Sequence, residues 1–250
     1  MIQWAYGAIG WPHPMSYVAE RIAKLGYQGL EGFGLLDLLP PDQRLAFTLH
    51  SNKLKFVGSY FSASLVQPDR LPDELDDFRA TCRKIRELGG TKVAVGAGRI
   101  LDDVDKSVLW DRLLKSLNQM ADVAVQEQVD FCLHPHQGNL IYTYEETKRV
   151  IENTPDSVRL TLDTAHVHAA GCKVVQVFEE FYPRLGHVHL KDYRDSTFLP
   201  LGEGEVALGD VLAFLQRANY SGWATVELDA AREPEVCAKR SMEFLRKHSR

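Results

Sequence analysis

The chain has 250 residues, enough for one large α/β domain, and its 45% apolar and 25% charged residues are typical of a globular protein. Its net charge of −5 at pH 7 gives no basic surface of the kind that nucleic acids bind, so we expect no nucleic-acid partner. No apolar run approaches the roughly 18 residues of a membrane span, so we expect no membrane association.

The cysteines and the first residues predict a cytoplasmic location. No Cys-x-x-Cys pair occurs, which is typical of free thiols in a reducing compartment rather than of a disulfide framework. The first six residues, Met-Ile-Gln-Trp-Ala-Tyr, lack the charged and apolar regions of a signal peptide. A homo-oligomer is compatible with the sequence, but no feature of the sequence predicts one.

Short β-like runs alternate with amphipathic helical runs along the whole chain. In chain order we expect strand Ile2–Tyr6, helix Ser16–Leu25, strand Gly29–Phe33, helix Pro41–Asn52, strand Leu54–Tyr60, helix Asp73–Leu88, strand Lys92–Val95, helix Lys106–Glu127, strand Asp130–His134, helix Tyr144–Asn153, strand Arg159–Leu162, helix Lys173–Phe181, strand Gly186–His189, helix Gly209–Ala218, strand Trp223–Leu228 and helix Pro234–Lys247. In the third helix, Phe78, Cys82 and Ile85 recur every three or four residues, and Gly89-Gly90 end the run.

Eight strand–helix units predict a parallel sheet, because parallel neighbours need a crossover connection. A closed (β/α)₈ TIM barrel is the simplest arrangement for that number, and we expect residues 1–250 to form one such domain. A doubly wound open sheet is the alternative. The absence of a Gly-x-Gly-x-x-Gly motif after the first strand weakens it.

Six of the nine histidines form three His-x-His pairs, at or just beyond the ends of the fifth, sixth and seventh strands. The pairs are His134/His136, His166/His168 and His187/His189. Residues i and i+2 of an extended segment point the same way, so each pair is expected to direct two imidazoles to one end of the barrel. A single pair is more often structural. Three pairs on successive strands predict a functional site at the C-terminal face.

Two acidic residues complete this constellation. Asp163 ends the sixth strand within Leu-Asp-Thr-Ala-His, and Glu227 ends the eighth within Thr-Val-Glu-Leu-Asp. An unpaired carboxylate among apolar strand residues is costly, which favours a bound cation. The alternative is an interior salt bridge to Lys191 or Arg194. Imidazole and carboxylate donors suit one divalent metal, for which we expect Mn²⁺, with Co²⁺, Fe²⁺, Zn²⁺ and Mg²⁺ as alternatives.

Five segments, spread over nearly the whole chain, carry a resemblance to a known family. They are Ala-Ile-Gly-Trp (8–11), Gly-Ser-Tyr-Phe-Ser-Ala-Ser-Leu (58–65), His-Pro-His-Gln-Gly (134–138), Leu-Asp-Thr-Ala-His (162–166) with Ala170-Gly171, and His-Val-His-Leu-Lys-Asp (187–192). Through them the chain resembles the xylose isomerase-like sugar phosphate isomerase/epimerase superfamily, and within it the inosose dehydratase-like branch.

The resemblance implies a ligand set. The superfamily usually holds its metal with a strand-five glutamate, a strand-six aspartate, a strand-seven histidine and a strand-eight glutamate. Asp163, His189 and Glu227 match three of these positions, and His134 stands at the fourth, as in the dehydratase-like branch. Epimerases of the superfamily use their two glutamates as a proton-exchanging pair. The histidine therefore puts that mechanism in doubt and leaves elimination.

The activity implied is removal of the proton α to the carbonyl of a keto sugar or keto-cyclitol, followed by β-elimination, as in an inosose dehydratase-like lyase. A sugar isomerase or epimerase is the alternative. We expect Glu227, His136 or His166 to take the proton. Lys191 is expected to pair with the oxyanion, the alternative being a structural lysine.

The substrate is expected to contact side chains that follow several strands, namely Trp11, Glu31, Tyr60, Ser62 and Glu203. Trp11 and Tyr60 either stack on a ring or pack in the core, and Glu31 either binds a hydroxyl or orients a ligand. Glu203 lies in a Gly-rich loop, 201–205, whose acidity favours a non-phosphorylated substrate.

Two remoter functions stay open. An abasic-site endonuclease shares the barrel but needs more metal ligands and a basic surface. A non-catalytic sugar-binding barrel would keep its ligand after chelation.

Overall fold

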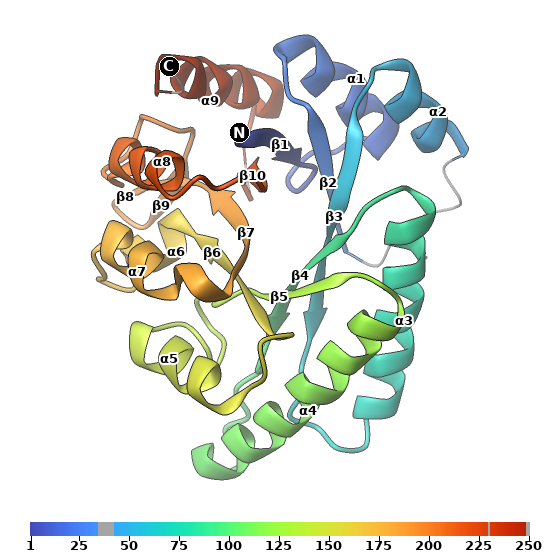
Figure 1. Cartoon of the computed structure of the whole chain (residues 1–250), viewed down its shortest axis with the longest axis vertical. Helices are drawn as coiled ribbons and strands as arrows, with labels where there is room; N and C mark the ends of the chain where they lie inside the picture. Colours follow the sequence, from blue (N-terminus) through green and yellow to red (C-terminus); the bar gives the residue numbers. More distant parts are fainter. Residues whose placement is uncertain (35–42, 230, 249–250) are drawn as a thin grey trace.

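A computed structural model of the protein describes residues 1–34, 43–229 and 231–248. Eight parallel strands close into one barrel, in the order β1-β10-β7-β6-β5-β4-β3-β2 (Figure 1). The strands are β1 (Gln3–Gly7), β2 (Gly29–Phe33), β3 (Lys55–Ala63), β4 (Lys92–Ala97), β5 (Asp130–Leu133), β6 (Arg159–Asp163), β7 (Leu185–Leu190) and β10 (Trp223–Val226). The predicted (β/α)₈ TIM barrel is confirmed.

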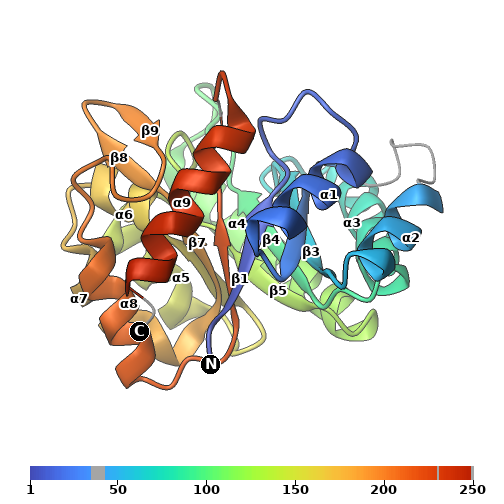
Figure 2. The same cartoon turned by 90° about the horizontal axis from the view of Figure 1, so that it is seen from above.

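Helices surround the barrel, and the last one, α9, packs beside α1 and α8 (Figures 1 and 2). The helices are α1 (Met15–Leu25), α2 (Gln43–Ser51), α3 (Leu71–Glu87), α4 (Lys106–Gln126), α5 (Tyr144–Asn153), α6 (Thr164–Ala169), α7 (Val174–Phe181), α8 (Leu208–Arg217) and α9 (Pro234–His248). The predicted start of the second helix, at Pro41, lies outside the described residues. None of the helices in the described part of the chain combines the length and apolar character that a bilayer span requires.

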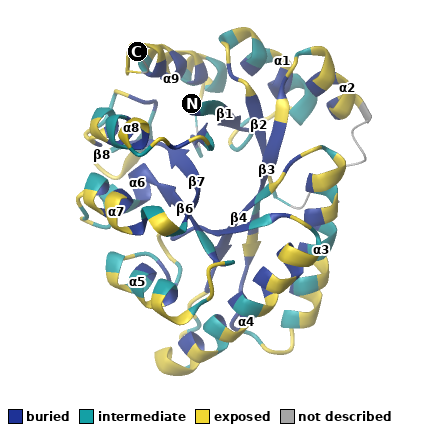
Figure 3. Cartoon of the chain, viewed as in Figure 1, coloured by how far each residue is buried: buried dark blue, intermediate teal, exposed yellow. Residues whose placement is uncertain are grey.

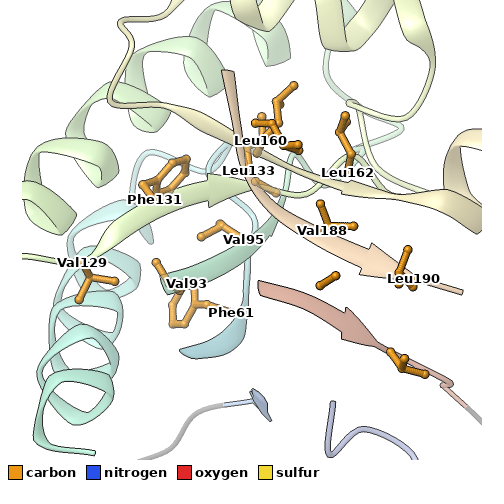
Figure 4. Close-up of a cluster of buried hydrophobic side chains, with 14 of the residues drawn as sticks. Phe61, Val93, Val95, Val129, Phe131, Leu133, Leu160, Leu162, Val188 and Leu190 are labelled. Carbon is orange, nitrogen blue, oxygen red and sulfur yellow. The ribbon is translucent and has the colours of Figure 1, made fainter. Parts of the chain in front are cut away.

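Strand residues alternate between two environments. One set points toward the helices and forms a continuous apolar layer, which includes Val93, Val95, Leu160, Leu162, Val188 and Leu190 (Figure 4). The alternate set, which includes Glu31, Thr161, His187 and Thr225, is polar and buried. Figure 3 shows the same division, with buried strands inside and exposed outer helix faces. The period-two pattern thus places polar side chains in the barrel interior.

Three features were not predicted from the sequence: a short helix, a hairpin and a 3₁₀ turn. The short helix α6 begins directly at the end of β6, where the sequence predicted extended backbone. After β7 the chain forms a two-stranded antiparallel hairpin, β8 (Asp192–Arg194) and β9 (Thr197–Leu199), outside the barrel. A 3₁₀ turn, η2 (Tyr182–Arg184), also separates α7 from β7. Both α6 and the hairpin lie beside the C-terminal ends of the strands, where they shape the site.

Candidate metal centre

The four predicted ligand residues converge at the C-terminal end of the barrel, called the mouth below. His134 follows β5, Asp163 ends β6, His189 lies in β7 and Glu227 follows β10. One donor atom of each side chain lies within 4.8 Å of the donor atoms of the other three, and all four side chains are buried. Asp163 and His189 are also paired directly across β6 and β7. These four side chains are called the cluster from here on.

The converging atoms lack hydrogen bonds. Within the described residues, His134 Nε2, Asp163 Oδ2, His189 Nδ1 and Glu227 Oε2 are buried without a hydrogen-bond partner. His189 Nδ1 and Glu227 Oε2 lie 2.8 Å apart but are not aligned for a hydrogen bond, and His134 Nε2 lies 3.8 Å from Asp163 Oδ2. Buried polar atoms ordinarily have partners. Four such atoms around one point, from two imidazoles and two carboxylates, fit a divalent cation.

Asp163 uses its two carboxylate oxygens for different purposes. Oδ1 accepts hydrogen bonds from the backbone N–H groups of Ala165, at 2.8 Å, and His166, at 3.1 Å, and so caps α6. Oδ2 remains for the cluster. The capped helix fixes the direction of the carboxylate, because the side chain cannot rotate without breaking both bonds.

Both carboxylates of the cluster are held in the charged form. Burial by itself would raise the pKa of Asp163, but Lys191 and His166 outweigh it and lower that pKa well below its usual range. Burial opposes ionisation of Glu227 in the same way, and Lys191 and His189 lower its pKa to about 2. Ionised carboxylates are the form that binds a cation.

Lys191 contributes a positive charge beside the cluster. Its side chain is 1% exposed, and Nζ lies 3.0 Å from Asp229 Oδ2 and 3.5 Å from both Asp163 Oδ2 and Glu227 Oε2. Burial would lower the pKa of Lys191, but these carboxylates raise it above its usual range. The interior salt bridge considered from the sequence therefore exists for Lys191. Arg194 does not take part in it, because this residue is exposed at the end of β8.

Lys191 alone does not balance the buried carboxylates. Glu31, Asp163 and Glu227 are all buried, whereas the cationic groups beside them are the Lys191 ammonium group and the His189 imidazole. Burial by itself would lower the pKa of His189, but the two glutamates outweigh it and raise that pKa well above its usual range. Uncompensated charges in a protein interior are costly. A divalent cation and Lys191 together match this negative charge better than Lys191 alone.

Two further histidines line the mouth. The ring centroid of His166 lies 4.1 Å from that of His136 and 5.5 Å from that of His134. Burial lowers the pKa of His166 to about 3, against the opposing effect of Asp163. The His166 imidazole is therefore neutral at pH 7. His136 donates from Nδ1 to the carbonyl oxygen of Gln137, at 2.7 Å.

The expectation that His166 and His168 point the same way is wrong. Both lie in α6, where residues two apart point to different sides of the helix. His166 turns toward the cluster, whereas the ring of His168 packs 5.9 Å from that of Tyr193 in the hairpin. The other two His-x-His pairs do bring both rings together.

Glu31 lies beneath His189 and not at the surface of the mouth. Its side chain is 3% exposed, and its two oxygens contact His187 Nε2, at 2.8 Å, and His189 Nε2, at 3.1 Å. From the sequence, Glu31 was expected either to bind a substrate hydroxyl or to orient a metal ligand. Its contact with His189 fits the second role. Glu31 also lines the small cleft formed by Tyr60, His189 and Glu227, so its two imidazole contacts, rather than enclosure alone, assign it this role.

Aromatic side chains border the cluster on the side of β2 and β3. The ring of Tyr60 lies 5.8 Å from that of His134, and Phe33 stacks on Tyr60 at 5.2 Å. Both line a small cleft together with His189 and Glu227. Trp11 instead packs edge-on against Tyr6, 6.2 Å away, at the end of β1. Ser62 is exposed near the end of β3.

Glu203 does not join these residues. Its carboxylate forms an ion pair with Arg240 of α9, at 3.1 Å, and both side chains are partly exposed. The expectation that it contacts substrate is therefore not supported by its position. The loop around it is held by Asp192, whose buried carboxylate accepts from the backbone N–H groups of Gly202, Gly204 and Val206, at 2.9, 2.9 and 3.1 Å.

Two residues of the site were missed from the sequence. Phe198, in the hairpin, places its ring 4.7 Å from Lys191 Nζ and 5.2 Å from the ring of His166. Asp229 is the nearest carboxylate to Lys191. Asp229 stands two residues after Glu227 in an extended segment, so the spacing used for the histidines would have identified it. Nothing in the sequence identifies Phe198, because its contacts depend on the fold of the hairpin.

Comparisons with known proteins agree with this architecture. Residues 19–248 match the family described as xylose isomerase-like TIM barrel. Inosose dehydratase from Bacillus licheniformis is 25% identical, over 94% of this chain and 90% of that protein. A probable 3-DHS dehydratase from Bacillus anthracis superposes with a TM-score of 0.86 at 14% identity, covering 98% of this chain and 99% of the other.

A third similar protein is an epimerase. The structure of 3-keto-D-glucoside 4-epimerase from E. coli superposes with a TM-score of 0.85 at 18% identity, covering 99% of this chain and all of the other. Dehydratases and epimerases thus share this fold. The family match extends over most of the chain, and the resemblance to inosose dehydratases inferred from the sequence motifs is confirmed. The chain belongs to the xylose isomerase-like TIM-barrel family and is an enzyme of the sugar isomerase superfamily.

Proposed function

We propose that this enzyme is a divalent-metal-dependent dehydratase that acts on a non-phosphorylated keto sugar or keto-cyclitol. The observation that carries the proposal is the cluster of four buried donor atoms, from His134, Asp163, His189 and Glu227, that converge without a hydrogen-bond partner among the described residues. The similarity to inosose dehydratase over most of both chains supports the lyase assignment. Mn²⁺ is the proposed metal, because it accepts both imidazole and carboxylate ligands.

The reaction is an elimination of water from a β-hydroxy ketone. The bond between the α-carbon and its hydrogen breaks, a carbon–carbon double bond forms, and the β-hydroxyl leaves with a proton as water, so no oxidant or reductant is needed. The bound cation supplies Lewis-acid stabilisation of the negative charge that develops on the carbonyl oxygen.

Proton transfer, oxyanion stabilisation and substrate contact are assigned to side chains around the cluster. Glu227 is ionised, and His166 is neutral with both ring nitrogens unpaired among the described residues, so each is able to accept the α-proton. His136 adjoins His166 and is suited to return a proton to the leaving hydroxyl. Lys191 holds a fixed positive charge beside the cluster, where it favours an oxyanion. Tyr60 borders the cleft and is suited to contact the substrate carbon skeleton.

The test is to incubate the metal-loaded enzyme with keto-inositols, ketohexoses and 3-keto-glycosides. Solvent deuterium incorporation and enone absorbance are followed together. We expect both signals with at least one substrate, and neither after chelation. Deuterium exchange without an enone would favour the second candidate, an epimerase, which the similarity to the 3-keto-glucoside epimerase supports at the level of the fold. Ligand binding that survives chelation without any exchange would indicate a binding protein.

His134, at the end of β5, allows a separate test of elimination against epimerisation. His134→Glu would place a second glutamate in the cluster, beside Glu227. Two glutamates at these positions are the pair that the superfamily's epimerases are expected to use for removing and returning a proton. We therefore expect epimerisation to increase relative to elimination, measured as the ratio of epimer to enone by NMR. His50→Glu, at an exposed position of α2, is the control and should leave that ratio unchanged. An unchanged ratio in the His134 variant would remove the argument from strand five.

A further inference from the structure

A buried bridge of side chains lies directly below the cluster. Glu31, on β2, accepts hydrogen bonds from His187 Nε2 at 2.8 Å and from His189 Nε2 at 3.1 Å. Around the barrel wall, β1 and β10 lie between β2 and β7, so the bridge crosses the interior. Thr225 Oγ1, on β10, lies 3.3 Å from His187 Nε2 and completes the contacts.

Each partner in the bridge is enclosed. Glu31 is 3% exposed, His187 0% and His189 2%. A buried carboxylate accepts hydrogen bonds and cannot donate them, so both imidazoles carry a proton on Nε2.

This protonation pattern has a consequence for the cluster. With Nε2 of His189 engaged below, the other ring nitrogen, Nδ1, faces Glu227 Oε2 at 2.8 Å. Nδ1 is the atom that lacks a hydrogen-bond partner among the described residues. Rotation of the His189 ring would remove Nδ1 from the cluster and would break the bond to Glu31.

The same three residues do not form a second cation site. Glu31, His187 and His189 also bring donor atoms within 4.8 Å of one another. Here, however, both carboxylate oxygens already lie at hydrogen-bond distance from an imidazole nitrogen. The cluster above differs because its four converging atoms have no hydrogen-bond partner among the described residues.

We propose that Glu31 and His187 are positioning residues, which hold His189 in the tautomer and ring orientation that present Nδ1 to the metal. The proposal rests on the proposed function, because it concerns the same metal. Glu31 acts on His189, and His187 acts on Glu31 by holding the second carboxylate oxygen. Carboxylates that accept from a metal-bound histidine usually affect metal affinity by about 10- to 100-fold.

The test is a metal titration of the purified protein after removal of bound metal. Glu31→Gln keeps the size of the side chain but places an amide NH₂ against one of the two imidazoles. We expect the dissociation constant for Mn²⁺, measured by calorimetry, to rise by roughly 10- to 100-fold. Because Glu31 is not proposed to touch substrate, saturating Mn²⁺ should restore most of kcat. Glu87→Gln, in an exposed ion pair on α3, is the matched control and should bind Mn²⁺ as the unmodified protein does.

A second readout concerns the tautomer. In protein loaded with diamagnetic Zn²⁺, ¹⁵N NMR of the histidine rings should show a protonated Nε2 and an unprotonated Nδ1 on His189, and this pattern should change in the Glu31 variant. His187→Asn is the second variant. The same Mn²⁺ titration is performed on it, so that the test remains possible if Glu31→Gln does not fold. We expect it to weaken Mn²⁺ binding less than Glu31→Gln does, because the bond between Glu31 and His189 remains.

The outcomes separate the two proposals. Unmodified protein that binds no divalent metal would remove the proposed function. Unmodified protein that binds Mn²⁺, together with a folded Glu31→Gln or His187→Asn variant of equal affinity, would overturn the positioning role alone.

Discussion

Asp163→Asn is expected to abolish metal binding while the fold remains intact. The amide oxygen of asparagine still accepts from the backbone N–H groups of Ala165 and His166, so α6 keeps its cap. The amide nitrogen then replaces Oδ2 and directs hydrogens at the cation. We expect stoichiometric metal to disappear and the elimination rate to fall by roughly 10³-fold or more.

The measurements are elemental analysis, the rate of enone formation and a thermal unfolding curve. Asp105→Asn is the matched control, because Asp105 also caps a helix, α4, but is exposed and does not belong to the cluster. This control should keep both metal and activity. Full metal content and normal activity in the Asp163 variant would contradict the site.

Lys191→Met should distinguish the contribution of the Lys191 ammonium group to stability from that of the bound cation. Methionine keeps most of the length and apolar volume but leaves Asp229, Asp163 and Glu227 without the ammonium group. Removing one partner of a buried ion pair typically costs about 3–5 kcal/mol. We expect a loss of that size in the free energy of unfolding when chelator is present, and a smaller loss when Mn²⁺ is present, because the cation then compensates the carboxylates.

Unlike the stability of the Lys191→Met variant, its catalytic rate should not be recovered when Mn²⁺ is bound. If Lys191 stabilises the oxyanion, the variant should lose about 10²- to 10³-fold in kcat even with metal bound. Urea unfolding with and without Mn²⁺ gives the stability, and enone absorbance gives the rate. Lys106→Met removes an exposed ion pair with Glu146 and should cost less than about 1 kcal/mol. Equal loss with and without Mn²⁺ would show that the cation and Lys191 do not share the same carboxylates.

The barrel was predictable because the pattern of a strand-like run followed by an amphipathic helical run repeats eight times along the chain. Each strand shows apolar residues toward the helices, and local turn residues mark its ends. The period of two then sets the common direction of alternate residues, which is why Asp163, His187 and His189 could be assigned to the C-terminal end of the barrel before their contacts were known.

Contacts between distant segments were not predictable. The partners of Glu31 lie 156 and 158 residues away, so no local pattern reveals that both its oxygens are engaged. The helix α6 was missed because Asp163 was interpreted only as a ligand, although the same aspartate is also an N-cap. Phe198 reaches Lys191 only because the hairpin folds back over the mouth, and no residue type in that segment predicts such a turn.

Asp192 holds together the two ends of the connection between β7 and α8. Its carboxylate joins the start of the hairpin to the loop at 202–206, and a Cβ added at Gly204 would overlap that carboxylate. The excursion that carries Phe198 is therefore held together at its base. It is also anchored to α9, where the Leu201 N–H donates to Ser241 Oγ and Glu203 pairs with Arg240. A substitution at its tip can therefore alter the surface that faces Lys191 and His166 while the eight strands beneath keep their positions.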